Sequence, residues 1–325
     1  MKSLLILSVL TLAAQASRFL VLNDIHLTIQ ETPYELPMAG EKCNKKLLRT
    51  MLEKAYKEID EEDLGLTAIL LPGDFIEHGL SAYNTTVPNQ AWPEMLAIFE
   101  TVINMIVEFF PNTPILPAIG NNDCYYHDQA PKVENQTKYY TELQDIFFKN
   151  VSANAAIYSN ATLMDTWMTG GYYAYQLTDD LMLITLNGIY PFTSNHVQIT
   201  NGTELMLNWL NETLNANPNM KFMTQVHVFF GRNYYQGEEL FWYTNFTDKL
   251  MEIFLPFQDN HVLSIGAHIH HINVVAPYSK TSPDVAVVQI IMPAISPCYN
   301  NNPGFGILTI DDTDQSIEKF EFIFL

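Results

Sequence analysis

The chain has 325 residues, enough for one large domain or two ordinary ones, and its 48% hydrophobic and 16% charged residues are typical of a globular protein. Lys and Arg total 16 against 36 Asp and Glu, so the formal net charge is −20. This charge disfavours binding to nucleic-acid polymers and anionic membranes, because both need basic residues, and any anionic substrate must be met locally by a metal or a few donors.

The first residues have the pattern of a secretory signal. Lys2 supplies a positive start, residues 4–14 form an apolar run, and Ala14-Gln15-Ala16 matches a cleavage site. We expect a signal peptide over 1–16, one mature domain over 17–325, and a secreted or lumenal protein, either extracellular or in a lysosome- or phagosome-like compartment. The alternative is a buried N-terminal strand. No later apolar stretch is long enough to cross a bilayer, so no stable membrane insertion is expected.

Helical and strand patterns then alternate, and a strand-rich tail follows. A one-sided apolar stripe predicts the first helix, and Pro93 and Pro111 bound the second. The expected helices are 44–61, 93–110, 135–149, 203–216 and 244–255. The expected strands are 19–22, 67–71, 115–119, 172–177, 181–186, 221–226, 262–265, 285–292, 306–310 and 317–324. This order predicts a layered α/β sandwich with two sheets inside.

Two further features bear on the secretory route. Seven Asn-x-Ser/Thr triplets predict several glycans, at Asn84, Asn135, Asn150, Asn160, Asn201, Asn211 and Asn245. The three cysteines, Cys43, Cys124 and Cys298, allow at most one intrachain disulfide, and the sequence leaves the pairing open.

Potential metal ligands follow five of the predicted strands. The motifs are Asn23-Asp24-Ile25-His26, Gly73-Asp74, Gly120-Asn121-Asn122-Asp123, His227 and Gly266-Ala267-His268-Ile269-His270. Ligand-binding groups gather at the carboxyl ends of strands in α/β sheets. Residues two apart in an extended segment face the same way, so Asp24 with His26, and His268 with His270, are expected to reach one metal region together.

The ligand types in these motifs predict two divalent ions. Carboxylate, amide oxygen and imidazole suit zinc, with manganese or iron as alternatives, more than they suit calcium. Seven ligands are too many for one zinc and suit two ions that share Asp74. Two ions roughly 3.5–4 Å apart clamp a phosphoryl group and activate a water.

The set and order of these motifs resemble those of the calcineurin-like metallophosphoesterases. The resemblance implies a four-layer α/β/β/α sandwich. It also implies that one ion is held by Asp24, His26, Asp74 and His270. The other ion would then be held by Asp74, Asn121, His227 and His268.

Within that superfamily, residues 18–322 are similar to the acid sphingomyelinase-like phosphodiesterases. The similar segments are Gly73-Asp-Phe-Ile-Glu-His78, Gly170-Gly171-Tyr172-Tyr173, Leu183-Ile-Thr-Leu-Asn187, His227-Val-Phe-Phe-Gly231 and the run from Ser296 to Phe305. Three departures stand out. Asn122 replaces the His that protonates the leaving group in most members, although secreted endopolyphosphatases also show Gly-Asn-Asn-Asp. Gly79 replaces the Asp after His78, and Phe229-Phe230 replaces Pro-Pro.

The remaining candidates concern proton transfer and substrate binding. His78 is the first choice for general acid and phosphate contact, and His127 is the second. Asn122 could donate a hydrogen bond to a phosphate oxygen. Four aromatic residues could wall a base- or choline-binding pocket, although core packing is the favoured interpretation: Trp167, Tyr172, Tyr173 and Tyr190.

The sequence therefore predicts a secreted, glycosylated, monomeric phosphodiesterase or related phosphoric ester hydrolase. We expect a small soluble phosphorylated substrate of nucleotide or phosphocholine type, attacked by a hydroxide that bridges the two metals. One alternative is a catalytically silent secreted binding protein, which Asn122 favours. The other is a sphingomyelin phosphodiesterase. The acidic charge disfavours it, as does a chain that begins almost on its first strand and ends just after its last, with no room for lipid-extracting segments.

Overall fold

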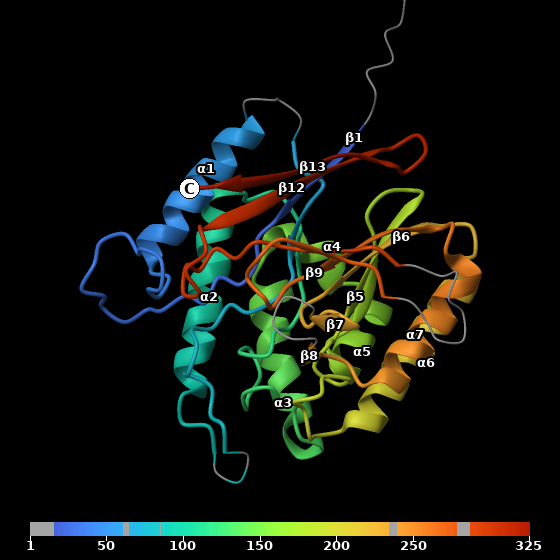
Figure 1. The fold of residues 1–325 in the computed structure, drawn as a ribbon, viewed down its shortest axis with the longest axis horizontal. Coiled ribbons are helices and arrows are strands. Elements are labelled where there is room, and N and C mark those ends of the chain that lie inside the picture. Colours follow the sequence, from blue (N-terminus) through green and yellow to red (C-terminus); the bar gives the residue numbers. More distant parts are fainter. Residues whose placement is uncertain (1–15, 61–64, 85, 87, 234–238, 278–286) are drawn as a thin grey trace, which may run out of the picture.

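The computed structural model describes residues 16–60, 65–84, 86, 88–233, 239–277 and 287–325. Two stacked sheets lie inside, and helices flank them (Figure 1). The first sheet has the order β13 (Ile317–Phe324), β12 (Gly304–Asp311), β1 (Ala16–Val21), β2 (Ala68–Leu71) and β3 (Ile115–Pro117). The second has the order β10 (Asn273–Val275), β11 (Gln289–Ile291), β9 (His261–Gly266), β6 (Lys221–Val226), β5 (Leu181–Leu186) and β4 (Tyr173–Gln176). A small ribbon pairs β7 (Arg232–Asn233) with β8 (Glu239–Leu240).

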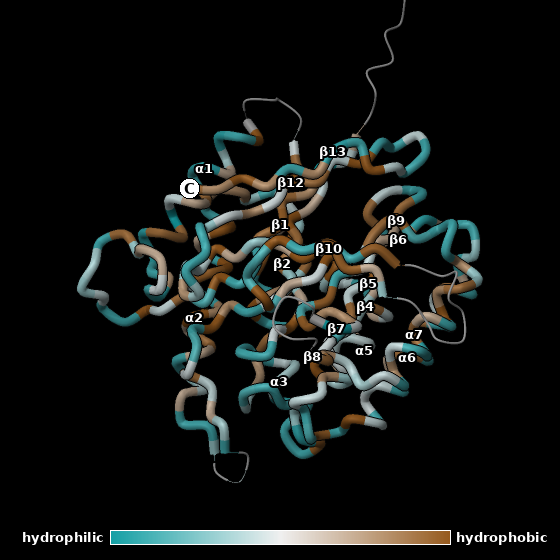
Figure 2. The backbone as a smooth tube through the Cα atoms, viewed as in Figure 1, coloured by the Kyte–Doolittle hydropathy of each residue, from teal (hydrophilic) through white to brown (hydrophobic). Residues whose placement is uncertain are grey.

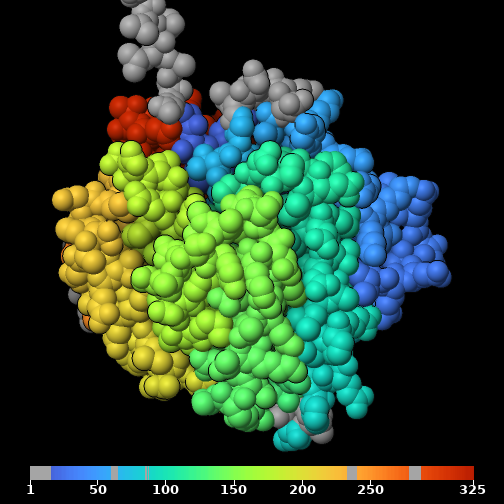
Figure 3. All heavy atoms as spheres, turned by 180° about the vertical axis from the view of Figure 1, so that it is seen from behind, coloured from blue at the N-terminus to red at the C-terminus, as the bar shows by residue number. Residues whose placement is uncertain are grey.

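Helices surround both sheets. Beside the first sheet lie α1 (Lys45–Asp60) and α2 (Trp92–Phe109), and beside the second lie α6 (Ile199–Ala216) and α7 (Thr244–Phe254) (Figure 1). Seen from behind, the middle of the molecule is covered by the segment with α3 (Val133–Gln144), α4 (Ala155–Tyr158) and α5 (Ala161–Gly170), in green (Figure 3). The described residues also form three short π- or 3-10 helices: η1 (Asp145–Lys149), η2 (Ser152–Asn154) and η3 (Leu255–Phe257).

Parallel strands form the centre of each sheet. β1, β2 and β3 are parallel to one another, and so are β5, β6, β9 and β11. Every residue of β2, β3 and β5 is buried, as expected for strands covered on both faces, and Figure 2 shows the hydrophobic segments gathered inside. Gln225 Nε2 donates across the sheets to the Leu116 carbonyl at 3.0 Å. This stacking brings the carboxyl ends of strands from both sheets to one region.

The predicted fold class is confirmed, because two sheets flanked by helices form a mixed α/β sandwich. Several short elements were missed in the sequence: α4, α5, β7, β8 and β10. The predicted helix 135–149 ends in the π-helical turn η1, and Gly171 with φ 67° caps α5. Of the predicted signal peptide, residues 1–15 lie outside the described part, and Ala16 begins β1. Among the described helices, none is long and apolar enough to span a membrane.

Candidate metal centre

The loops that follow three strands of the first sheet and two strands of the second come together in one region. They bring together all seven candidate ligands of the sequence. The loops after β1, β2 and β3 carry Asp24, His26, Asp74 and Asn121. The loops after β6 and β9 carry His227, His268 and His270. All but His268 are at most 5% exposed, so the cluster is a buried polar site.

One side of the cluster combines two carboxylates with imidazoles. Ligand atoms of Asp24, His26 and Asp74 all lie within 4.8 Å of one another. His270 Nε2 is 3.7 Å from Asp24 Oδ1 and 3.1 Å from His26 Nε2. His26, His270 and His78 form a further group within the same limit, which adds His78 to the residues near this side.

The other side shares Asp74 with the first. Ligand atoms of Asp74, His227 and His268 lie within 4.8 Å of one another. His227 Nε2 is 3.2 Å from Asp74 Oδ2. The Asn121 Oδ1 atom is 3.0 Å from His227 Nε2 and 2.9 Å from His268 Nδ1. Asp74 therefore lies where the two ligand groups meet.

The backbone of five candidate ligands is left-handed, which the sequence did not reveal. Their φ angles are 43° for Asp24, 44° for His26, 59° for Asp74, 80° for His268 and 61° for His270. Non-glycine residues seldom adopt such angles, and those that do cluster at functional sites. The expectation that each residue pair sits in an extended segment is wrong, although both members of each pair do reach the cluster.

Backbone carbonyls fix the orientation of two of the imidazole rings. His26 Nδ1–H donates to the Ile76 carbonyl at 2.8 Å, and His227 Nδ1–H donates to the Pro72 carbonyl at 3.1 Å. In the neutral form of each ring, the Nε2 lone pair then faces the centre, as in histidines that bind metals.

The electrostatics of the cluster suit cations. Burial opposes ionisation of Asp74, but His227 and His26 hold the pKa of its carboxyl well below the usual range. Burial likewise opposes the charged form of His227, yet the Asp74 carboxylate raises the pKa of His227 to about 9. Burial and the proximity of His227 lower the pKa of His268 to about 3.

Whether divalent ions fit this cluster can be judged from a buried carboxylate oxygen that lacks a hydrogen bond. Within the described part of the chain, Asp24 Oδ1 is buried and has no hydrogen-bond partner. The Nε2 atoms of His26, His270 and His227 lie 3.8, 3.7 and 4.0 Å from it. A divalent cation bound by carboxylate, amide and imidazole groups would satisfy this oxygen. The donor set therefore fits the two ions inferred from the sequence.

The loop after β3 is tied to Asp74. Asn122 donates from its backbone N–H to Asp74 Oδ1 at 2.9 Å and from Nδ2 to Asp74 Oδ2 at 2.8 Å. The Asp123 carboxylate accepts backbone N–H groups of Asp74, Phe75 and Gly120 at 2.7–2.8 Å. Asn122 thus contacts a candidate ligand, and its predicted contact with substrate phosphate stays a prediction.

His78 stands at the edge of the cluster, beside a cavity. Its ring stacks on His26 with the centroids 3.7 Å apart, and burial with the proximity of His26 lowers the pKa of His78 to about 3. The cavity has a volume of about 370 Å³, and its lining includes His26, Lys42, Tyr83 and Tyr299. A bound phosphate would raise this pKa, because a nearby anion favours the protonated ring.

His127 lies on the loop that carries Asn121. Its Nε2 atom is 3.4 Å from Asp128 Oδ1, and its ring centroid is 4.5 Å from that of Tyr83. Asn121 Nδ2 also donates to Asp128 at 2.9 Å. The second candidate acid is therefore near the cavity, next to a carboxylate that can orient its ring.

The aromatic residues at the cavity differ from those considered in the sequence. The four aromatic residues considered in the sequence are at most 3% exposed and belong to the hydrophobic core, which was the favoured interpretation: Trp167, Tyr172, Tyr173 and Tyr190. Tyr83 is 69% and Tyr299 54% exposed, and both line the cavity. Sequence reasoning missed this pair, because both lie in loops without a local pattern.

Most of the predicted glycosylation sites are exposed, and the cysteines are not disulfide-bonded. Six of the sequon asparagines are exposed and Asn135 is half-buried, while Thr85 of the first sequon lies outside the described residues. All three cysteines are free: Cys43 and Cys124 are buried, and Cys298 is partly exposed. The structure therefore contains none of the possible disulfide pairings among these cysteines.

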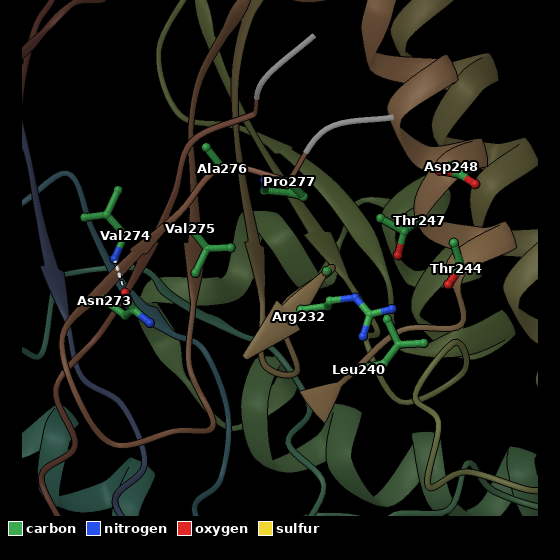
Figure 4. A pocket seen from close by; sticks show the side chains of 11 residues that line it. Arg232, Leu240, Thr244, Thr247, Asp248, Asn273, Val274, Val275, Ala276 and Pro277 are labelled. Carbon is green, nitrogen blue, oxygen red and sulfur yellow. Dashed lines mark hydrogen bonds between the residues drawn. The ribbon is translucent and has the colours of Figure 1, made fainter. Parts of the chain in front are cut away.

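A second cavity, of about 270 Å³, lies between the β7–β8 ribbon, the start of α7 and β10. Figure 4 shows the Thr244 and Thr247 hydroxyls turned toward the Arg232 side, whereas the Asp248 carboxylate points away. None of the candidate ligands lines this cavity. Of these two cavities, the one beside His78 is therefore the one that adjoins the candidate ligands.

Comparisons with known proteins show the family and the fold. The model of the calcineurin-like phosphoesterase family matches residues 17–271. A dimetal phosphatase from Danio rerio has a similar fold, with a TM-score of 0.59 and 11% identity, over 95% of this chain and 98% of that chain.

Curated relatives are similar at low identity. Sphingomyelinase phosphodiesterase C of Dictyostelium discoideum is 27% identical over 85% of this chain and 61% of its own length. Human cyclic GMP-AMP phosphodiesterase SMPDL3A is 23% identical over 74% of this chain and 53% of its own length. The endopolyphosphatase of Schizosaccharomyces pombe is 25% identical over 78% of this chain and 42% of its own length. The chain thus spans about half the length of the curated relatives it matches.

Proposed function

The chain belongs to the calcineurin-like phosphoesterase family, and from this premise we propose that it is a metal-dependent phosphoric ester hydrolase whose two-metal catalytic centre is the cluster around Asp74. The observation that carries the proposal is that two ligand groups share the Asp74 carboxylate. Asp24, His26 and His270 would hold one ion with it. Asn121, His227 and His268 would hold the other. Two such ions supply charge neutralisation at the phosphoryl group and a nucleophile from water.

The protein's own residues then orient the substrate and its leaving group. His78 borders both the ligand cluster and the cavity, so a phosphodiester in the cavity would place an oxygen within its reach. We assign to His78 the contact with phosphate and the proton given to the leaving oxygen, with His127 as the second candidate. Asn122 would act by holding Asp74, through its two hydrogen bonds.

The proposed substrate is a small soluble phosphodiester or nucleotide. A cavity of about 370 Å³ with two exposed tyrosines has room for a base or a choline group, and aromatic faces attract both. The net charge of −20 disfavours long polyphosphate and anionic bilayers. The relative that acts on cyclic GMP-AMP supports a nucleotide, whereas the sphingomyelinases keep sphingomyelin as the second candidate.

We also propose a secreted or lumenal glycoprotein that is monomeric and uses zinc. The sequon positions described above support glycosylation, and the apolar run over 4–14 supports secretion. The N-terminal sequence and the glycopeptides of the protein from its native source, read by mass spectrometry, test this. Cleavage after Ala16 and glycans on the exposed asparagines are expected.

Replacement of one carboxylate tests the catalytic centre. Asp74→Asn should abolish hydrolysis of bis-p-nitrophenyl phosphate and lower the zinc content per chain, because one carboxylate serves both ligand groups. Asp165→Asn is the matched control, since Asp165 is exposed on α5. An Asp74→Asn protein that keeps its zinc and turns over within about tenfold of the parent would contradict the proposal, because loss of even an outer-shell partner typically costs 10–100-fold.

A substrate panel tests the class. We expect faster hydrolysis of nucleotides, cyclic dinucleotides or nucleotide-choline compounds than of sphingomyelin in liposomes. The reverse order would assign the protein to the sphingomyelin phosphodiesterases. Absence of turnover on every compound, with zinc bound, would favour the catalytically silent binding protein.

A further inference from the structure

Cys298 lies where the loop before β12 passes the metal cluster. Its Sγ atom is 3.6 Å from His270 Nδ1 and 3.7 Å from His78 Nδ1. The loop is held to the exit of β1, because Ile295 N–H donates to the Asn23 carbonyl and Ser296 N–H to the Asp24 carbonyl, both at 3.0 Å. The position of the sulfur relative to the cluster is therefore set by backbone contacts.

The contact with His270 gives its second ring nitrogen an acceptor, as two other candidate ligands have. His26, His227 and His270 all direct Nε2 toward Asp24, and the first two donate Nδ1–H to backbone carbonyls. A metal-binding histidine needs an acceptor for its second ring N–H, which fixes the tautomer and the ring orientation. For His270, the Cys298 sulfur occupies that position.

The contact with His78 adds a second consequence. A thiol has one S–H donor and sulfur lone pairs, so Sγ can accept from His270 Nδ1–H and donate to His78 Nδ1. The proton of a neutral His78 ring is then on Nε2, which lies 3.4 Å from the Tyr299 hydroxyl, beside the cavity. This tautomer directs Nε2–H toward the space where a substrate would bind. In the protonated ring that a bound phosphate favours, Nδ1–H donates to a lone pair of Sγ, and Nε2–H is the proton that passes to the leaving oxygen.

We propose that Cys298 is a positioning residue that joins the metal ligand His270 to the substrate-facing His78 and holds both rings in their working tautomers. The proposal rests on the proposed two-metal function of this cluster. The sequence alone left this cysteine as one of three possible disulfide partners. The structure instead places a free thiol between two functional imidazoles.

Zinc affinity is the first test, measured on the full chain by competition with a chelator. Cys298→Ala should weaken Zn²⁺ binding by about 10–100-fold, the usual effect of losing an outer-shell partner. Cys298→Ser should retain most of the affinity, because a hydroxyl also accepts and donates. Cys43→Ala is the matched control: its thiol is buried and donates to the Asn44 carbonyl at 3.7 Å.

Steady-state kinetics at saturating zinc give the second test. Cys298→Ala should lower kcat for a phosphodiester with an alkoxide leaving group while Cys298→Ser rescues it, and both variants, stripped of metal with a chelator, should unfold at the same temperature as the metal-free parent. Equal zinc affinity and kcat in Cys298→Ala and the parent would overturn the proposal, as would a Ser variant no better than Ala.

The Asp74→Asn variant separates this failure from failure of the proposed function. If Asp74→Asn loses zinc and turnover while Cys298→Ala matches the parent, only the role of Cys298 is wrong. If Asp74→Asn also keeps both, the proposed metal centre itself is wrong.

Discussion

Asp74 shows how one residue can be constrained by several demands at once. It has a left-handed backbone, its carboxylate accepts two hydrogen bonds from Asn122, and it faces His26 and His227. The residue at position 120 must be small, because a Cβ there would lie 2.1 Å from Asp74 Oδ1. Such local strain is retained where the surrounding structure over-determines it, as at a functional site.

His78 is the residue whose chemical role is most open to measurement. His78→Ala should slow hydrolysis of a diester with an alkoxide leaving group by about 10²–10⁴-fold, but a nitrophenyl diester far less, because nitrophenolate leaves without a proton. Single-turnover rates on both substrates check this.

Two variants serve as controls for that experiment. Tyr299→Phe removes only the hydroxyl beside His78 Nε2, and His127→Ala tests the second candidate acid. Equal losses on the two substrates would make His78 a binding residue. A leaving-group-dependent loss in His127→Ala alone would assign the acid role to His127.

At the scale of elements, packing of β9 against α7 makes the free energy of unfolding depend on pH. His261 stacks on Phe254 of α7 at 5.3 Å between ring centroids, and its Nε2 lies 3.2 Å from Ser264 Oγ. Burial lowers the pKa of His261 to about 4 from 6.5. Between these values the unfolded chain binds a proton that the folded chain does not, so the free energy of unfolding falls as pH decreases from 6.5 to 4.

Replacement of this ring should reduce the acid sensitivity. At about 1.4 kcal/mol per pKa unit, the loss attributable to His261 is at most about 3 kcal/mol by pH 4, and less because the residue is only partly buried. His261→Phe keeps the stacking and should flatten this part of the profile, measured by urea unfolding at several pH values. His196→Phe, at an exposed position, is the control. A profile in His261→Phe as steep as that of the parent would refute the assignment.

At the scale of the whole molecule, two sheets contribute ligands to one centre, so bound ions should stabilise their packing. Removal of metal with a chelator should lower the stability by about 2.7 kcal/mol for a site that was filled at 100 times its Kd. For a chain of 325 residues that corresponds to a fall in Tm of about 4 °C.

Differential scanning calorimetry with and without chelator checks this effect. Zinc should restore the Tm of the parent, whereas Asp74→Asn should respond less to either treatment, because it lacks the shared carboxylate. A parent protein whose Tm is unchanged by chelator and by zinc would show that ions do not link the sheets.

The fold class, the main strands and helices, and the seven side chains that meet at the cluster could all be predicted from the sequence. These follow from local patterns, because periodicity marks strands and the carboxyl ends of parallel strands meet at one edge. The left-handed ligand backbones, the Asn122 contacts with Asp74, and the positions of Tyr83 and Tyr299 at the cavity became visible only in the folded chain. The same holds for the contact of Cys298 with His78, 220 residues away in the chain. Contacts between loops so far apart depend on how the two sheets stack, and no local pattern encodes that distance.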